Sequence, residues 1–327
     1  MTALLQAEGV VKQFTVRGGL FAEKRLLTAV AGVDLELFPG ETLGLAGESG
    51  CGKSTVARLL TGLIPATRGS IRYAGRELSA MDRGERAQYR KDVQMIFQDP
   101  FSSLNPRMRV SEIIGEPLAI HGIGNVAQRR ERVASLLQRV GLTPDQLSRF
   151  PHEFSGGQRQ RIGIARALAV SPKLIIADEP VSALDLSIQA QIINLLQEVK
   201  QDLGLSFLFI THDLSVLRHL SDRIAIMYLG RIVESGRRDD VLSRPLHPYT
   251  EALLSAIPSI DPAKKKTRQI IARGELPSPL SPPSGCPFHP RCPYAEEICG
   301  ELRPELLEKE PGHRAACHFS ERIYRPK

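Results

Sequence analysis

GESGCGKST, residues 47–55, has the most specific pattern in this 327-residue chain, G-x-x-x-x-G-K-[ST], which is typical of phosphate-binding loops. An apolar run over residues 42–46 comes before it, and a helical pattern over residues 56–60 comes after it. The pattern requires a loop between a strand and a helix, and these flanking residues predict that arrangement. The sequence therefore predicts an α/β fold that binds a nucleotide.

The glycines of this loop suit an anion site because they let successive backbone N–H groups turn inward at a helix N-terminus. Lys53 is expected to reach the β- and γ-phosphates, and Ser54 is expected to bind Mg²⁺. A glycine turn that only joins a strand to a helix is the alternative, but it would not need a lysine and a serine behind it. The predicted nucleotide-binding residues of the loop are Gly47, Glu48, Ser49, Gly50, Cys51, Gly52, Lys53, Ser54 and Thr55.

The composition is ordinary for a soluble protein, with 42% hydrophobic and 24% charged residues, and the length allows one large domain or two. No apolar run approaches the roughly 18 residues of a membrane-spanning helix. Residues 1–14 lack the pattern of an export signal, so we expect the protein to stay in the cytoplasm. A net charge of +7 fits a nucleotide, an anionic membrane surface or nucleic acid, and does not choose among them.

Three further apolar runs are predicted to be buried strands, and each leads into polar side chains. The first ends at Gln98 and the second at Asp178 and Glu179, while His212 follows the third. Ligands of open α/β sheets bind beyond the carboxyl ends of the strands, so these side chains are expected to face the nucleotide. Gln98 would meet Mg²⁺ or the attacking water, Asp178 would hold Mg²⁺, and Glu179 would polarise the attacking water. A helix N-cap pair is the alternative for the two carboxylates, and a structural role is the alternative for the histidine.

Two other stretches are candidates for nucleotide contact. Phe14, at the end of the first predicted strand, is placed to stack on an adenine ring, although a core-facing residue fits the pattern equally well. Residues 101–149 show helical periodicity, which predicts a helical insertion that leads to a second glycine-backed helix N-terminus and a second potential anion site. The predicted residues of this second site are Ser155, Gly156, Gly157 and Gln158.

After Gly236 the sequence loses strand character, and one helical stretch is followed by prolines that forbid regular structure. Four of the five cysteines lie in this tail, which in a reducing compartment favours metal over disulfides. Their spacing differs from that of common zinc ribbons, and four thiolates suit either Zn²⁺ or a [4Fe-4S] cluster. Free buried thiols are a weaker alternative, because the tail lacks apolar residues for a core of its own. The predicted ligands are Cys286, Cys292, Cys299 and Cys317, with His289, His313 and His318 as substitutes of lower rank.

Taken together, these motifs resemble the nucleotide-binding subunits of ABC transporters over about residues 4–236. The matching motifs are residues 47–54 as the P-loop, Gln98 as the Q-loop, residues 154–158 as the signature, Asp178 and Glu179 as Walker B with the catalytic base, residues 182–185 as the D-loop, and His212 as the switch histidine. The signature starts with Phe154, where the family most often has Leu. The resemblance implies a P-loop NTPase fold with a RecA-like core, an antiparallel β-subdomain and a helical signature subdomain at about residues 101–165.

The resemblance also explains the second anion site, because two ATPase domains of this family pair head to tail. The signature of one domain covers the γ-phosphate held by the P-loop of the other, so hydrolysis of ATP needs a dimer. In this mechanism Glu179 orients the attacking water and His212 contacts the γ-phosphate, while Lys53 and Mg²⁺ stabilise the charge of the transition state.

Residues 93–108, residues 245–258 and the cysteine tail together look like the ATPase subunits of bacterial dipeptide and oligopeptide importers, with nickel importers close by. This resemblance implies an ATPase domain at residues 1–240 and an importer-specific extension at residues 241–327, and it favours a [4Fe-4S] cluster over Zn²⁺. It also implies a second ATPase subunit, two permease subunits and an extracytoplasmic peptide-binding protein as partners. The expected place is peripheral, at the cytoplasmic face of the bacterial inner membrane.

The alternative from another class is a soluble ABC ATPase that acts on nucleic acid, ribosomes or iron–sulfur assembly. Relatives on ribosomes generally carry two ATPase domains in one chain, and repair relatives insert long coiled coils, whereas this sequence has neither. A kinase or GTPase on the same loop would not account for residues 155–158. We therefore expect an importer subunit without a nucleic-acid partner.

Overall fold

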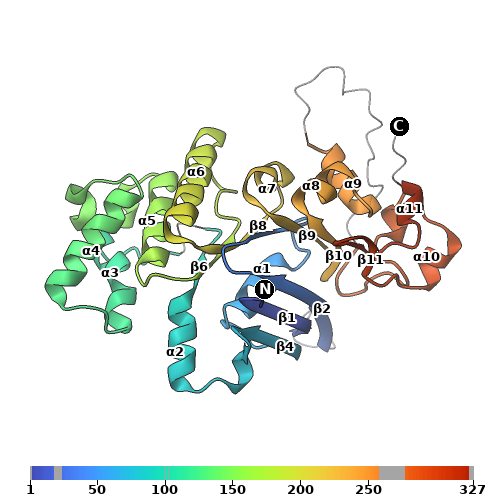
Figure 1. Cartoon of the computed structure of the whole chain (residues 1–327), viewed down its shortest axis with the longest axis horizontal. Helices are drawn as coiled ribbons and strands as arrows, with labels where there is room; N and C mark the ends of the chain where they lie inside the picture. Colours follow the sequence, from blue (N-terminus) through green and yellow to red (C-terminus); the bar gives the residue numbers. More distant parts are fainter. Residues whose placement is uncertain (1, 18–23, 100, 102, 258–276, 324–327) are drawn as a thin grey trace. The chain divides into compact units, whose positions relative to one another are not determined.

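The computed structural model describes residues 2–17, 24–99, 101, 103–257 and 277–323 (Figure 1). The chain divides into two compact units, each assembled from separate stretches of sequence. The first unit holds Met1–Leu5, Leu37–Thr42 and Arg72–Ile210, and the second unit holds Gln6–Glu36, Leu43–Ile71 and Thr211–Lys327. The chain therefore passes between the two units several times.

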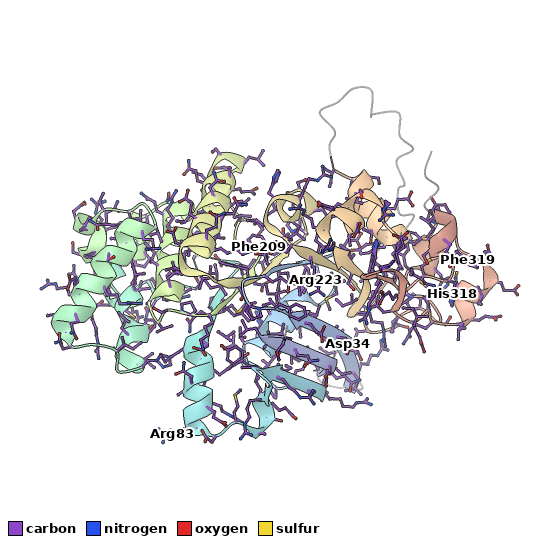
Figure 2. All side chains as sticks on the ribbon, in the orientation of Figure 1. Asp34, Arg83, Phe209, Arg223, His318 and Phe319 are labelled. Carbon is purple, nitrogen blue, oxygen red and sulfur yellow. The ribbon has the colours of Figure 1, made fainter. Side chains whose placement is uncertain are left out.

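The first unit contains three parallel strands in the order β8-β7-β6. Their bounds are Val93–Ile96 for β6, Leu174–Asp178 for β7 and Ser206–Thr211 for β8. Ile176 of β7 lies between Met95 of β6 and Leu208 of β8 in the register. Every residue of β7 and β8 is buried, including Phe209 (Figure 2). Parallel strands are covered on both faces, which explains why continuous apolar runs predicted them.

Helices α3, α4 and α5 pack against one another in the first unit and form the predicted helical subdomain, drawn in green in Figure 1. The buried residues of α3 are all apolar, and they are Val110, Ile113, Ile114 and Leu118. Helix α5 also contacts α6 and strand β6. The bounds in this unit are Arg76–Glu77 for β5, Leu78–Ala80 for η1, Arg83–Asp92 for α2, Val110–Ile120 for α3, Val126–Arg139 for α4, Pro144–Ser148 for η2, Pro151–Glu153 for η3, Gly156–Leu168 for α5 and Leu186–Leu203 for α6.

The N-terminal strands form a sheet of their own, in the order β2-β1-β4. Their bounds are Leu5–Arg17 for β1, Lys24–Leu37 for β2 and Arg68–Tyr73 for β4. Strand β4 runs on into the first unit, where it pairs antiparallel with β5 and places Arg72 opposite Glu77. Val10, Val30 and Val33 are buried in this part of the second unit, so one side of the sheet supplies its core.

The second unit also contains a mixed sheet in the order β11-β12-β10-β9-β3. Strand β3 is buried throughout and runs parallel to β9, with Leu45 beside Ala225. The pairings of β9 with β10, β10 with β12, and β12 with β11 are antiparallel. The bounds are Thr42–Ala46 for β3, Arg223–Tyr228 for β9, Arg231–Arg237 for β10, Leu307–Glu310 for β11 and His313–Ala315 for β12.

The cysteine-rich tail contributes β11 and β12 to this sheet, so the prediction that strand structure ends at Gly236 is wrong. Ala315 pairs with Glu234 of β10, and the Ala316 N–H donates to the Val233 carbonyl at 2.8 Å. Three of the four residues of β11 are charged, and both strands are short, which hides their strand character in the sequence. The tail is therefore an integral part of the second unit.

The helices of the second unit are short, and α9 begins with Pro248 in the first turn, where the missing N–H of proline costs nothing. Their bounds are Lys53–Leu60 for α1, Leu214–Leu220 for α7, Arg238–Ser243 for α8, Pro248–Ser255 for α9, His289–Arg291 for η5, Glu297–Glu301 for α10 and Ser320–Ile323 for α11. Across the described ranges of both units, no helix combines the length and apolar character needed to cross a lipid bilayer.

Candidate nucleotide-binding site

In the second unit, residues 47–52 form the predicted loop between β3 and α1. Gly50 and Gly52 have φ angles of 80° and 110°, in the left-handed region that favours glycine, and a Cβ at Gly52 would clash with the carbonyl oxygen of Ala29. Gly52 is the N-cap residue of α1, so the unpaired N–H groups of the first helical turn lie at the loop. This backbone geometry is the one that binds phosphate.

Lys53 begins α1, and only 4% of the residue is exposed. Its ammonium group donates hydrogen bonds to the carbonyl oxygens of Gly47, at 2.7 Å, and of Glu48, at 3.0 Å. These contacts hold the charge within the loop, where it attracts a phosphate. Glu48 in turn contacts Tyr249 and Arg291, two residues of the C-terminal part that the sequence pattern did not predict.

In the first unit, the predicted Gln98 and Glu179 lie together. Gln98 Nε2 donates to Glu179 Oε2 at 3.1 Å, and the Glu179 N–H donates to the carbonyl oxygen of Ile210 at 2.9 Å. Asp178 and Glu179 are buried, with 3% and 8% exposed. Glu179 has a φ of 45°, a conformation that costs a non-glycine residue about 1–3 kcal/mol and is concentrated at functional sites. Asp178 ends the buried strand β7 and Glu179 follows it, in agreement with the prediction, and neither residue is the N-cap of a described helix.

The predicted signature residues form the N-terminus of α5 in the first unit. Ser155 Oγ accepts a hydrogen bond from the Gln158 N–H at 3.3 Å, and Gln158 Oε1 accepts one from the Ser155 N–H at 3.0 Å. This capping box fixes the start of the helix while Ser155 stays exposed. Gly157 is buried against Ile188, and Phe154 is buried with 4% exposed, so the Phe at this position serves as a core residue.

His212 and Phe14 belong to the second unit. His212 is exposed and directly follows β8, where Asp213 Oδ1 accepts the Ser215 N–H and caps α7. Phe14 lies on β1 with 37% exposed, and the Lys12 ammonium lies 5.2 Å from the centre of its ring. The alternative that Phe14 faces the core is therefore wrong. Its stacking on adenine stays a prediction.

The four tail cysteines line one small cavity of ≈ 20 Å³ in the second unit. All five cysteines of the described chain are free thiols. Burial raises the pKa of Cys292 to about 12 and that of Cys317 to about 11, and it also raises the pKa of Cys286. The negative charge of neighbouring cysteines adds to each shift, so four thiolates in this cavity would repel one another. A cation or a cationic cluster would relieve that repulsion, and the donor set suits a soft metal.

The arrangement does not confirm a metal centre. Within the part of the chain that the structure describes, no group of three or more His, Cys, Asp or Glu side chains is arranged to hold a metal ion. The predicted ligands share a cavity, but they do not form a coordination site. The substitute histidines make other hydrogen bonds: His289 with the Cys286 carbonyl, His313 with Glu234, and His318 with the Leu302 carbonyl.

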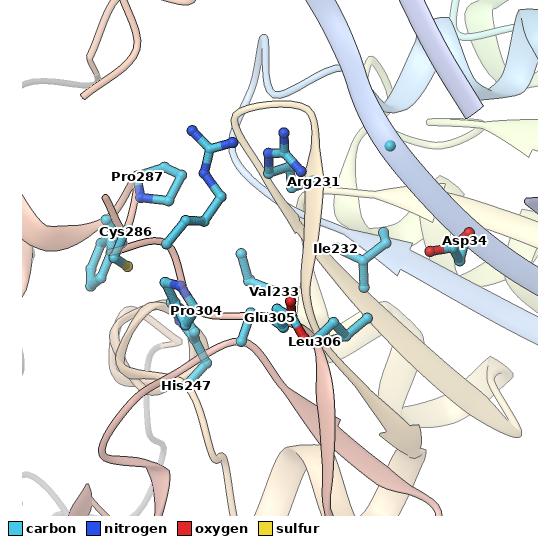
Figure 3. Close-up of a pocket in the computed structure, with 14 residues that line it drawn as sticks. Asp34, Arg231, Ile232, Val233, His247, Cys286, Pro287, Pro304, Glu305 and Leu306 are labelled. Atoms are coloured by element: carbon cyan, nitrogen blue, oxygen red, sulfur yellow. The ribbon is translucent and has the colours of Figure 1, made fainter. Parts of the chain in front are cut away.

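A larger cavity of ≈ 390 Å³ adjoins the cysteine cavity in the second unit (Figure 3). Arg231, Glu305 and Leu306 line it, and Arg231 is the first residue of β10. The residues that line both cavities are His247, Cys286, Phe288 and Pro304. Cys286 therefore borders the larger cavity as well as the cysteine cavity.

Two family models match the chain. One is described as "ABC transporter" and matches residues 30–182; the other is described as "Oligopeptide/dipeptide transporter, C-terminal region" and matches residues 233–299. The oligopeptide transport ATP-binding protein AppF of Bacillus subtilis is 52% identical over 319 residues, with 97% of each chain covered. The oligopeptide transport ATP-binding protein OppF of Escherichia coli is also 52% identical over 319 residues, with 96% of this chain and 95% of OppF covered.

Solved structures share the fold. A dimeric post-hydrolysis state of the ATP-binding cassette MJ0796, bound to ADP and Pi, has a TM-score of 0.64 and 28% identity, covering 72% of this chain and 98% of that one. The structure of cbiO1 from Clostridium perfringens, part of the ABC transporter complex cbiONQ, has a TM-score of 0.63 and 26% identity, covering 74% and 92%. The predicted fold class is confirmed.

Proposed function

Because the chain belongs to the ABC transporter family and carries the C-terminal region of oligopeptide and dipeptide transporters, we propose that it is the ATP-hydrolysing subunit of a bacterial peptide importer. The observation that carries the proposal is the folded phosphate-binding loop with the buried Lys53, within a chain that matches oligopeptide transport ATP-binding proteins over nearly its whole length. Its substrate is ATP, and its cargo is a dipeptide or an oligopeptide.

We propose that Lys53, Ser54, Gln98, Asp178 and Glu179 act on one bound ATP. The loop N–H groups and Lys53 bind the β- and γ-phosphates, while Ser54, Gln98 and Asp178 would hold Mg²⁺. Bound Mg²⁺ would supply positive charge to the phosphate oxygens as the terminal bond breaks. The chain contributes chiefly positioning and electrostatic stabilisation, because phosphoryl transfer needs little covalent help from the protein.

Glu179 orients the attacking water in this proposal. Its carboxylate accepts the amide hydrogen of Gln98 at 3.1 Å, and its backbone is tied to Ile210, so both ends of the residue are fixed. A carboxylate held in this way can accept a proton from water at the moment of attack. His212 would contact the γ-phosphate, and Phe14 would stack on the adenine ring.

We propose that ATP is hydrolysed between two such subunits arranged head to tail. The support is the exposed N-terminus of α5, where Ser155, Gly156, Gly157 and Gln158 offer a second phosphate-binding helix end in the same chain. The MJ0796 cassette, of the same fold, is described as a dimer. The partner would be a second ATPase subunit, either a copy or a paralogue of this chain.

Two permease subunits and an extracytoplasmic peptide-binding protein would complete the importer, and the subunit would sit at the cytoplasmic face of the inner membrane. The match to the oligopeptide and dipeptide transporter C-terminal region favours this function over a soluble ATPase that acts on nucleic acid or ribosomes. Co-expression with cognate permeases separates the two, because an importer subunit is recovered with them in the membrane fraction.

We also propose that Cys286, Cys292, Cys299 and Cys317 ligate a [4Fe-4S] cluster, with Zn²⁺ as the other outcome of the test. The support is the convergence of the four thiols on one cavity, where burial and neighbouring cysteines raise the pKa values of Cys286, Cys292 and Cys317. Anaerobically purified protein is expected to absorb at roughly 400 nm and to contain iron and sulfide. A colourless protein with one zinc ion per chain would replace the cluster by zinc.

The function is tested by the Glu179→Gln variant in the reconstituted importer. We expect ATP to bind and phosphate release to fall by about 10²–10⁴-fold, because the amide cannot act as a base. Glu198→Gln, which changes an exposed glutamate of α6, is the matched control and should leave turnover unchanged. Normal phosphate release by Glu179→Gln would contradict the assignment of the base, and a wild-type chain that fails to bind ATP would contradict the function.

A further inference from the structure

The P-loop residue Glu48 is held from two sides by the C-terminal part of the chain. Its backbone N–H donates to the Tyr249 hydroxyl at 2.7 Å. Its carboxylate accepts two hydrogen bonds from Arg291, Nη1 to Oε2 at 2.7 Å and Nη2 to Oε1 at 3.0 Å. This bidentate, charge-assisted geometry fixes direction as well as distance, which a single contact from a lysine would not do. All of these residues belong to the second unit.

A buried aromatic cluster fixes the two groups that hold Glu48. Tyr228, Tyr249 and Phe288 are at most 1% exposed, and their ring centres lie 4.6–5.4 Å apart. The Arg291 guanidinium lies 6.0 Å from the ring centre of Tyr228 and 5.9 Å from that of Phe288, and Arg291 as a whole is 8% exposed. A guanidinium stacked among packed rings has few alternative positions, so the ion pair is preorganised.

These contacts connect the P-loop to residues that lie more than 200 positions later in the sequence. Tyr249 lies in the first turn of α9, and Arg291 ends the short helix η5, directly before Cys292. Both lie within residues 233–299, which match the transporter C-terminal region. Tyr228 is the last residue of β9, the strand that runs beside β3 and so supports the strand that leads into the P-loop. The P-loop therefore depends on the C-terminal region for part of its support.

We infer that Arg291 and Tyr249 are positioning residues of the nucleotide site, so that the C-terminal region sets the affinity for ATP. The inference rests on the proposed function. The loop contains Gly47, Gly50 and Gly52, which permit many backbone conformations, and a loop that is fixed before ATP arrives loses less entropy on binding. Arg291 directly precedes Cys292, one of the four predicted cysteine ligands. A displacement of the segment around Cys292 would therefore move the Arg291 side chain that holds Glu48 in the P-loop.

The test measures equilibrium binding of a fluorescent ATP analogue with Mg²⁺ to the full chain. We expect Arg291→Ala to raise the Kd about tenfold and Tyr249→Phe to raise it about threefold, within the usual range for residues coupled through direct contact. Turnover at saturating ATP should change little, because neither side chain belongs to the predicted reacting groups. Arg314→Ala, which changes an exposed arginine of β12 in the same region, is the matched control and should bind ATP as the wild type does.

A double-mutant cycle separates positioning from general packing. Once Glu48→Gln has removed the carboxylate, adding Arg291→Ala should have little further effect on the Kd, whereas an arginine that only packs against Tyr228 and Phe288 would give additive effects. Glu48→Gln carries the test by itself if Arg291→Ala does not fold, because the Glu48 side chain is 30% exposed. If the wild-type chain binds the analogue and the variants bind it with the same Kd, this inference alone is overturned. The same holds if the effects of Glu48→Gln and Arg291→Ala on the Kd are additive. A wild-type chain that does not bind the analogue would overturn the proposed function as well.

Discussion

His247 is a buried residue whose protonation state is tied to the fold. Its Nδ1 accepts the Tyr249 N–H at 3.1 Å, its ring also hydrogen-bonds to the Ala316 backbone, and it is 1% exposed. Burial lowers the pKa of His247 from 6.5 to about 3, because a buried cation loses its hydration. Protonation of Nδ1 would also remove the acceptor that caps α9.

The sign of the pH effect follows from the direction of this shift. Between pH 6.5 and about 3 the unfolded chain binds a proton at His247 and the folded chain does not, so acid favours unfolding. The contribution of neutral His247 to the free energy of unfolding is fully present above pH 6.5. It is lost at about 1.4 kcal/mol per pH unit as the pH falls from 6.5 towards 3.

We expect His247→Asn to flatten the pH dependence of the free energy of unfolding between pH 6.5 and 4. Asparagine can cap α9 through its side-chain oxygen and carries no charge in acid. Urea unfolding at a series of pH values measures the slope, and His219→Asn, at an exposed position of α7, should keep the wild-type slope. An equally steep slope in His247→Asn would assign the acid sensitivity to other groups.

Individual residues differ in how far the sequence reveals them. Gln98 and Glu179 were predicted to lie near the nucleotide because each follows a buried strand, and they are hydrogen-bonded to each other. Tyr249 and Arg291 escape such reasoning because they lie 201 and 243 residues from Glu48, and no motif connects them. Contacts over such distances depend on how the whole chain folds, not on local pattern.

The contact between α5 and α6 shows how closely two helices of the first unit approach. A Cβ at Gly157 would clash with Cγ2 of Ile188, whereas a Cβ at Gly163 of the same helix would meet nothing within 4 Å. The glycine at position 157 therefore lets the signature helix lie against α6. Close packing of this kind tolerates little added volume.

We expect Gly157→Ala to destabilise the first unit by about 1–3 kcal/mol, because the added methyl group overpacks the contact between the helices. Gly163→Ala, in the same helix, should be neutral or stabilising by up to about 1 kcal/mol, because alanine favours helix. Chemical denaturation measures both, and Ile188→Ala should restore stability to Gly157→Ala. A Gly157→Ala protein as stable as Gly163→Ala would contradict this account of the contact.

Elements with strong patterns were predicted well, and short charged ones were not. Strands β6, β7 and β8 follow from predominantly apolar runs, and α3 follows from its periodic apolar face. Strands β11 and β12 were missed because they have four and three residues and extend an existing sheet. Such strands are formed by their hydrogen-bonding neighbours, since their own side chains carry little apolar area.

At the scale of the whole molecule, the proposed metal site of the four tail cysteines predicts that stability depends on the bound metal. The thiol cavity, the aromatic cluster and β12 belong to the same unit, so a metal bound at the proposed site would stabilise that unit by its binding free energy. We expect removal of the metal by chelation or oxidation to lower the melting temperature by about 5 °C or more. The control is a chain with all four tail cysteines changed to serine, and its melting temperature should not respond to chelator. If the melting temperature of the wild type does not change either, the proposal that these cysteines bind a metal is contradicted.

The division into two units was not foreseen from the sequence. The chain crosses from one unit to the other at five places. The predicted boundary at residues 240 and 241 between an ATPase domain and an extension stays a prediction. This boundary was inferred from the loss of strand character in the sequence. Such a pattern indicates local secondary structure, but it does not indicate how distant segments pack.

The pairing of β12 with β10 and the contact of Arg291 with Glu48 have a consequence for how the protein is made. The ribosome adds Glu48 of the P-loop 243 residues before it adds Arg291, the residue that holds it. A nascent chain, or a chain truncated before Arg291, would contain the P-loop motif but would bind ATP more weakly. On the inference drawn above, full affinity for ATP is expected only once synthesis has passed Arg291 and that segment has folded onto Glu48.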